Sequence, residues 1–136
     1  MEKTIKKANN ILIQGNGPIR HFFRKPKYPI LCEINGHLIG AKSDRTLAKK
    51  LSLLELDDSK QYDVIDLTGE GWLLLTDHMV LSPVNFRKKR WTKLEIIRLF
   101  NNRANKSDPD EKPYSEKSLS AKKFDKIFRY IVEALD

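Results

Sequence analysis

Residues 30–41 read ILCEINGHLIGA, and this stretch decides the fold. Asn35-Gly36 lies between two apolar runs, and a two-residue type I′ hairpin turn favours this dipeptide because both of its positions need positive φ. The turn sets the register of the two strands. It pairs Ile30 with Ala41, Cys32 with Ile39 and Ile34 with His37, so one apolar stripe covers one face of the hairpin.

Helix and strand signals follow the hairpin. Ser43-Asp44 offers an N-cap, and leucines and an alanine then recur at helical spacing, which predicts a helix over residues 45–55. Residues 62–67 and 72–76 have the pattern of two strands joined by a turn at 68–71, and a third short strand over 79–82 ends at Pro83. Thr92 and Glu95 have capping-box spacing and predict a helix over 93–103.

The end of the chain carries the clearest amphipathic pattern. Apolar residues recur at i, i+3, i+4, i+7 and i+11 and predict a terminal helix with these residues buried: Phe124, Ile127, Phe128, Ile131 and Leu135. At the other end, residues 1–10 are expected to form a frayed basic N-terminus, and residues 11–14 to form a short strand followed by a turn. Pro26 and Pro29 argue against a helix within residues 20–28.

Together these elements predict one α+β domain over residues 11–136. Its small antiparallel sheet is built from hairpins and has about 4–6 strands. One helix is inserted after the first hairpin, and two C-terminal helices pack on the sheet. We expect the helices to share one face of the sheet.

Composition limits the function classes only broadly. The 136 residues include 26 Lys and Arg against 18 Asp and Glu, a formal net charge of +8, which is typical of chains that contact polyanions. Cys32 is the only cysteine, which excludes an intramolecular disulfide and favours a reducing compartment. We find neither a secretory apolar segment nor a membrane span, so we expect a cytoplasmic protein without membrane contact.

Two segments combine cations with aromatic residues. Residues 86–91 read FRKKRW, and successive cations can contact phosphates while flanking aromatic rings stack on bases. A second group lies within residues 20–28, near Phe23 and Tyr28. The candidate nucleic-acid-binding residues are therefore Arg87, Lys88, Lys89, Arg90, Trp91, Lys93, Arg24, Lys25 and Lys27. Under the alternative interpretation, Phe86 and Trp91 anchor the connection in the core and the cations are simply solvated.

A third basic feature lies on the polar side of the terminal helix. Lys122, Lys126 and Arg129 follow one another at i, i+4 and i+7, as they would on a recognition helix. An ordinary surface helix has the same pattern, and this helix carries no Asn or Gln that would read a base.

Catalytic chemistry finds little support in the sequence. His21, His37 and His78 are too far apart to form a helical or hairpin pair of metal ligands. Cys32 lies in an apolar run, so we expect a raised pKa and an inert thiol. We identify no catalytic residue, and we expect no metal and no cofactor.

Three hypotheses remain. The first is a non-enzymatic domain that binds a polyanion, nucleic acid in particular, through its basic and aromatic segments. The second is a protein-interaction module, such as an adaptor, an inhibitor or an accessory subunit, that contacts an acidic partner or adds a strand to a sheet edge. The third and weakest is an enzyme whose site the sequence does not reveal. Convergence of the basic segments on one face would favour the first.

Overall fold

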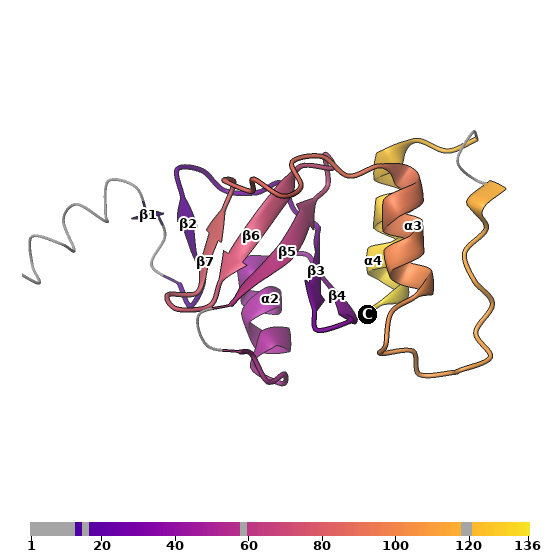
Figure 1. The fold of residues 1–136 in the computed structure, drawn as a ribbon, viewed down its shortest axis with the longest axis horizontal. Helices are drawn as coiled ribbons and strands as arrows, with labels where there is room; N and C mark the ends of the chain where they lie inside the picture. Colours follow the sequence, from indigo (N-terminus) through magenta and orange to yellow (C-terminus); the bar gives the residue numbers. More distant parts are fainter. Residues whose placement is uncertain (1–12, 15–16, 58–59, 118–120) are drawn as a thin grey trace, which may run out of the picture.

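A computed structural model describes residues 13–14, 17–57, 60–117 and 121–136, so the expected frayed N-terminus over residues 1–10 lies outside the described residues. One seven-stranded sheet has the order β1-β2-β7-β6-β5-β3-β4 (Figure 1). Its strands are β1 (Ile13–Gln14), β2 (Arg20–Phe22), β3 (Ile30–Ile34), β4 (His37–Ala41), β5 (Gln61–Asp66), β6 (Gly71–Leu75) and β7 (Val80–Ser82). The helices are α2 (Asp44–Leu51), α3 (Lys93–Asn101) and α4 (Phe124–Ala134). The predicted α+β class is confirmed.

The β3–β4 hairpin has the predicted register. Cys32 pairs with Ile39, and the flanking pairs also match the prediction. Asn35 and Gly36 have φ of 50° and 89°, the left-handed values that a type I′ turn requires. The dipeptide therefore determines both the turn and the pairing.

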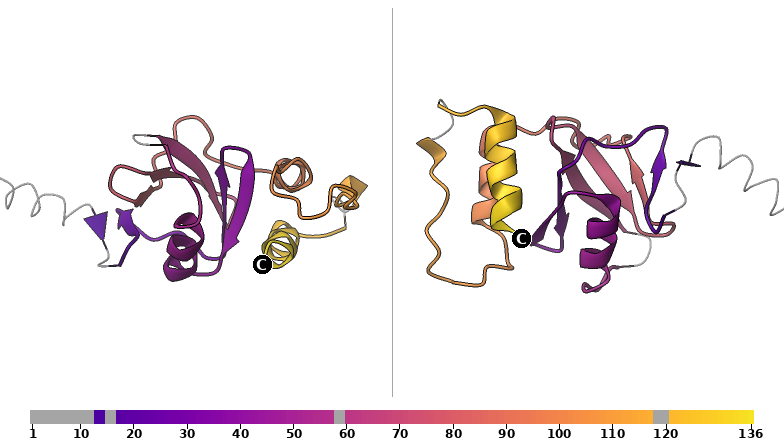
Figure 2. Two further views of the ribbon diagram at one scale, coloured as in Figure 1. Left: turned by 90° about the horizontal axis from the view of Figure 1, so that it is seen from below. Right: turned by 180° about the vertical axis from the view of Figure 1, so that it is seen from behind.

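The helices lie on both faces of the sheet, so the expectation that they share one face is wrong. Leu47 and Leu51 of α2 pack with Cys32 on one face, whereas α3 and α4 pack with Leu31 and Leu38 on the other. Figure 2 shows the sheet curving around α2, with α3 and α4 outside the β3–β4 hairpin. Both faces of β3 are apolar, and each face needs its own covering layer.

The helix starts match their capping signals, but two of the ends come early. The Ser43 side chain accepts from the Thr46 amide at 3.1 Å, and the Thr92–Glu95 capping box is complete. Helix α2 ends at Leu51, short of the predicted residue 55. The Ser52 hydroxyl donates to the Lys49 carbonyl at 2.6 Å, so a side chain takes over a carbonyl of the last turn. Helix α3 likewise ends two residues before the prediction.

Strand β2 is an addition that the sequence does not predict. It runs parallel to β7, with Arg20 opposite Val80 and His21 opposite Leu81, which makes an otherwise antiparallel sheet mixed. Three residues are too few to show a period-two pattern, and the partner strand lies far along the sequence. Local signals therefore could not reveal this pair.

Helix α4 is docked through its predicted apolar face, but Phe124 and Leu135 at its two ends are only partly buried, and Val132, which was not predicted, is buried. Its buried residues are Ile127, Phe128, Ile131 and Val132. They pack with the buried side chains of α3 and with Leu31, Leu38 and Ile65 of the sheet, and we call this group the second hydrophobic cluster. No helix in the described part of the chain has the length and apolar character needed to cross a bilayer. Both α3 and α4 begin at the same end of the molecule, at the top of Figure 1.

Candidate nucleic-acid interface

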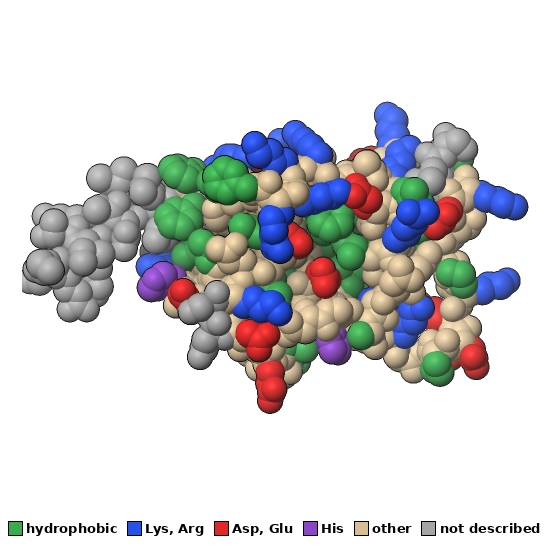
Figure 3. Space-filling view, in the orientation of Figure 1, with side chains coloured by type: hydrophobic (Ala, Val, Ile, Leu, Met, Phe, Trp, Pro, Cys, Tyr) green, Lys and Arg blue, Asp and Glu red, His purple; other side chains and the backbone are tan. Residues whose placement is uncertain are grey.

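Lys and Arg side chains follow the upper rim of the molecule in Figure 3, over the loops that join β2 to β3 and β7 to α3. These loops contain the two basic segments singled out in the sequence. Between them lies the turn at residues 66–71, which connects β5 to β6. We call residues 24–27, 66–71 and 87–93 together the basic rim.

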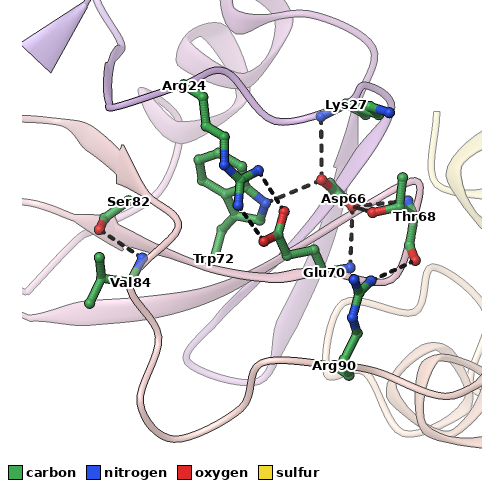
Figure 4. A network of polar contacts seen from close by, with 9 residues as sticks. All are labelled: Arg24, Lys27, Asp66, Thr68, Glu70, Trp72, Ser82, Val84 and Arg90. Atoms are coloured by element: carbon green, nitrogen blue, oxygen red, sulfur yellow. Dashed lines mark hydrogen bonds and ion pairs between the residues drawn. The ribbon is translucent and has the colours of Figure 1, made fainter.

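Asp66 organises the turn at the centre of the basic rim. Its carboxylate is buried and accepts hydrogen bonds from the backbone amides of Thr68 (2.9 Å) and Glu70 (3.2 Å). It also accepts from the Trp72 indole at 3.2 Å and from the Lys27 amide at 3.4 Å (Figure 4). One buried carboxylate thereby ties the turn to the first basic segment.

The first basic segment is further held to the turn by Arg24. Its guanidinium donates two hydrogen bonds to the Glu70 carboxylate, at 2.7 and 2.5 Å, and lies 4.9 Å from the centre of the Trp72 ring. The hydrogen bond from Arg24 lowers the pKa of Glu70, and the same bond raises the pKa of Arg24. Arg24 is thus partly neutralised where it stands.

The ends of the first segment are attached to the start of α2. His21 Nε2 lies 3.0 Å from the Asp44 carboxylate, and the Tyr28 hydroxyl donates to the same group. Burial is the main cause of the raised pKa of Tyr28. Lys25 also turns to Asp44, at 3.8 Å, so it does not join the other cations on the turn.

The second basic segment pairs with the opposite side of the turn. The Gly71 amide donates to the Lys89 carbonyl and the Trp91 amide donates to the Gly69 carbonyl, both at 2.9 Å. Gly71 is required for this approach, since a Cβ there would lie 1.9 Å from the Lys88 carbonyl oxygen. A short antiparallel bridge thus fixes the backbone of the basic run.

Asn85 shapes the start of the basic run. Its side chain is buried and donates to the Trp72 carbonyl at 3.2 Å and to Asp63 at 3.2 Å. Its amide oxygen accepts from the backbone of Arg87 and Lys88, at 3.1 and 3.0 Å. The side chain satisfies backbone groups that a strand or helix would otherwise pair.

Two cations of the run have acidic partners inside the fold. Arg87 lies 3.6 Å from Asp63, and Lys88 pairs with Glu95, the capping residue of α3. The hydrogen bond from Lys88 is the main cause of the lowered pKa of Glu95. These contacts give Arg87 and Lys88 a structural role.

Three other cations of the basic rim face solvent. Lys27, Lys89 and Arg90 are exposed, and no acidic side chain of the described residues lies within ion-pair distance of them. Arg90 donates a long hydrogen bond of 3.4 Å to the Thr68 carbonyl. Lys93 is the first residue of α3 and is partly exposed. The candidate cations therefore divide into paired and solvent-facing groups.

The aromatic candidates divide in a similar way. Trp91 packs against the second hydrophobic cluster, and Tyr28 is held by Asp44, so neither ring presents an open face. Phe86 is 85% exposed, which contradicts the interpretation that it anchors the connection in the core. Phe23 is 52% exposed. The Phe23 ring lies 5.9 Å from the Phe22 ring, so Phe86 is the aromatic candidate that is most open to solvent.

The three cations predicted for the polar side of the terminal helix do not form one group, and Lys122 precedes α4, which begins at Phe124. The Lys122 ammonium lies 5.7 Å from the centre of the Tyr114 ring, whereas Arg129 lines a separate hollow with Lys42 and Glu133. The start of α4 nevertheless touches the basic rim. A Cβ on Gly69 would lie 3.2 Å from the Phe124 ring, so this ring packs on the turn.

Two side chains of types that serve in catalysis, Cys32 and His21, have structural roles in this fold. Cys32 is buried and burial raises its pKa, as the sequence predicted. Across the residues that the structure describes, no three His, Cys, Asp or Glu side chains are grouped as a metal would require. The His21–Asp44 pair, which the sequence analysis missed, anchors the first basic segment.

Some of these contacts had a local signal and others had none. An Asp two residues before a Thr and three before a Gly is typical of a turn in which the carboxylate bonds the following amides, so Asp66 was recognisable. Arg24 and Glu70 are 46 residues apart, so no local sequence pattern indicates that they pair. Comparison with family models, with curated proteins and with solved structures found no match.

Proposed function

We propose that this protein is a non-enzymatic binding domain whose basic rim holds nucleic acid through its phosphates. The observation that carries the proposal is the meeting of two basic segments, about sixty residues apart in the sequence, on the two sides of one turn. Lys27, Lys89 and Arg90 point to solvent there, and a phosphate backbone offers them a row of negative charges.

The backbone beneath these cations is held firmly. Buried Asp66 and Asn85 bond the backbone on both sides, so the backbone that carries the cations does not have to be ordered when a ligand binds. Less entropy is lost on binding when the site is already formed. The first turns of α3 and α4 add their positive dipole ends to the same rim.

The competing proposal of an added strand is less well supported. The outer strand β4 has part of its free side covered, because the Asn105 side chain donates to the Leu38 carbonyl at 2.8 Å and accepts from the Leu38 amide at 2.9 Å. Lys50 also bonds the Gly40 carbonyl. An acidic protein bound at the basic rim is the alternative that experiment must separate from nucleic acid.

Neutralising the solvent-facing cations tests the proposal. We expect the triple variant Lys27→Gln, Lys89→Gln, Arg90→Gln to fold normally and to lose most of its affinity for labelled DNA or RNA in anisotropy titrations. The slope of log K against log salt should fall by up to about 0.9 per lost contact on duplex DNA and about 0.7 on a single strand.

The matched control removes the same charge elsewhere. Arg45, Lys49 and Lys112 are exposed and lie outside the basic rim. The variant Arg45→Gln, Lys49→Gln, Lys112→Gln should keep the parent slope. Equal losses in both variants would mean that only net charge matters, and absence of binding by the parent protein at about 50 mM salt would end the proposal.

A further inference from the structure

The exposed side chain of Phe86 directly precedes the second segment of the basic rim and lies beside its solvent-facing cations. A hollow of about 420 Å³ lies between the β5–β6 turn and the loop after β7. Phe86, Val84 and Pro83 form its apolar side, and its charged lining residues are Lys89, Arg90 and Glu70, whose carboxylate is paired with Arg24. Small-ligand sites occupy about 300–1,000 Å³, so the hollow has the size of a site for one planar group.

Packing does not explain the position of Phe86. Its ring is 85% exposed, and neighbouring Val84 is 41% exposed, although both follow a fully buried strand. Figure 3 shows hydrophobic side chains gathered at the end of the rim that lies over β2 and β7. Exposed apolar groups next to cations are typical of a binding surface.

Phe23, which directly follows β2, adds an independent observation. Its φ is 64°, and the Arg24 amide donates to the Phe22 carbonyl at 2.6 Å, so Phe23 is the central residue of a γ-turn with positive φ. This conformation is rare for a bulky residue and is strained. The turn leaves Phe23 half exposed while Arg24 points to Glu70.

We infer that the basic rim selects single-stranded nucleic acid, with one unpaired base seated in the hollow against Phe86 and the adjoining phosphates on Lys89 and Arg90. The inference rests on the proposed function and gives it a substrate class. Bases in a duplex are stacked on each other and offer no free face, whereas an unpaired base can lie on an aromatic ring beside a cationic backbone site.

The test compares three labelled polyanions by anisotropy: a DNA single strand of about 12 nucleotides, a duplex of the same length and inorganic polyphosphate. We expect the parent protein to bind the single strand most tightly. Phe86→Ala should weaken single-strand binding by about 5- to 150-fold, the loss expected for one stacked base, and should change duplex and polyphosphate binding less than about two-fold.

Two further variants separate stacking from simple apolar contact. Phe86→Tyr keeps the ring face and should retain the parent affinity, whereas Phe86→Leu keeps apolar volume without the ring and should bind as weakly as Phe86→Ala. Leu53→Ala is the matched control, because Leu53 is 81% exposed and lies outside the basic rim. Thermal melts of all variants should match the parent, since Phe86 is almost entirely in water.

Each other outcome overturns a different claim. If the parent binds none of the three polyanions, the proposed function fails. If the parent binds single strand and duplex equally and Phe86→Ala changes neither affinity, polyanion binding is supported, but the inference that a base lies against Phe86 is wrong. If Phe86→Ala weakens all three equally, stacking is wrong as well. Tighter binding of an acidic peptide such as polyglutamate than of the single strand would assign the rim to a protein partner.

Discussion

At the scale of single residues, the basic rim depends on small or buried groups more than on its cations. Gly71 has no room for a side chain because the Lys88 carbonyl lies against it. Asp66 and Asn85 supply hydrogen bonds that hold the two basic segments on the turn. The cations themselves are held in place by these neighbours.

Gly71→Ala should therefore be strongly destabilising. The added methyl would lie 1.9 Å from a backbone oxygen, and forced overpacking of this kind costs about 1–3 kcal/mol or more. We expect the free energy of unfolding to fall by at least about 2 kcal/mol in a urea titration. Gly17→Ala is the control, because its nearest contact would be 4.0 Å away, and it should stay within about 0.5 kcal/mol. Similar stability of the two variants would contradict the close approach.

Sequence reasoning reached some of these residues and missed others for a physical reason. The basic run and the turn at 68–71 are local patterns and were recognised as such. The exposure of Phe86 was not, because an aromatic residue beside a strand end reads equally well as a core anchor. Whether a side chain is buried depends on segments that are distant in the sequence.

At the scale of elements, the hairpin and the two C-terminal helices follow closely from their signals. Asn35-Gly36, the Thr92–Glu95 capping box and the apolar stripe of α4 all act over a few residues. Strand β2 and the burial of both sheet faces escaped prediction because they arise only when distant strands pair. The apolar residues Leu31 and Leu38 on the second face of the hairpin were the available clue.

Helix α4 should be essential to stability, because its buried face completes the second hydrophobic cluster. Phe128 is fully buried, and Phe128→Ala should lower the free energy of unfolding by about 3–5 kcal/mol, measured by chemical denaturation. Lys126→Ala, an exposed change on the same helix, should cost less than about 0.5 kcal/mol. An unfolding midpoint for Phe128→Ala equal to that of the parent would show that α4 is an appendage.

At the scale of the whole molecule, the proposed interface exists only because two basic segments meet at one turn. The sequence contains three basic features, and the fold brings two of them to one turn while it divides the third between two places. No local pattern predicts this, because it follows from the parallel pairing of β2 with β7 and from the path of the loop into α3. The fold thus places three exposed cations, Lys27, Lys89 and Arg90, in the two loops that meet at this turn.

The most direct test of this central claim is a map of backbone amide shifts. A ¹⁵N-labelled sample would be titrated with a short DNA single strand at moderate salt, and the perturbed amides would be assigned. We expect the largest shifts within residues 23–27, 66–71 and 84–93, and none beyond background in α2 or β4. Shifts centred on α2 or β4, or spread evenly over all exposed lysines, would contradict a nucleic-acid interface at the basic rim.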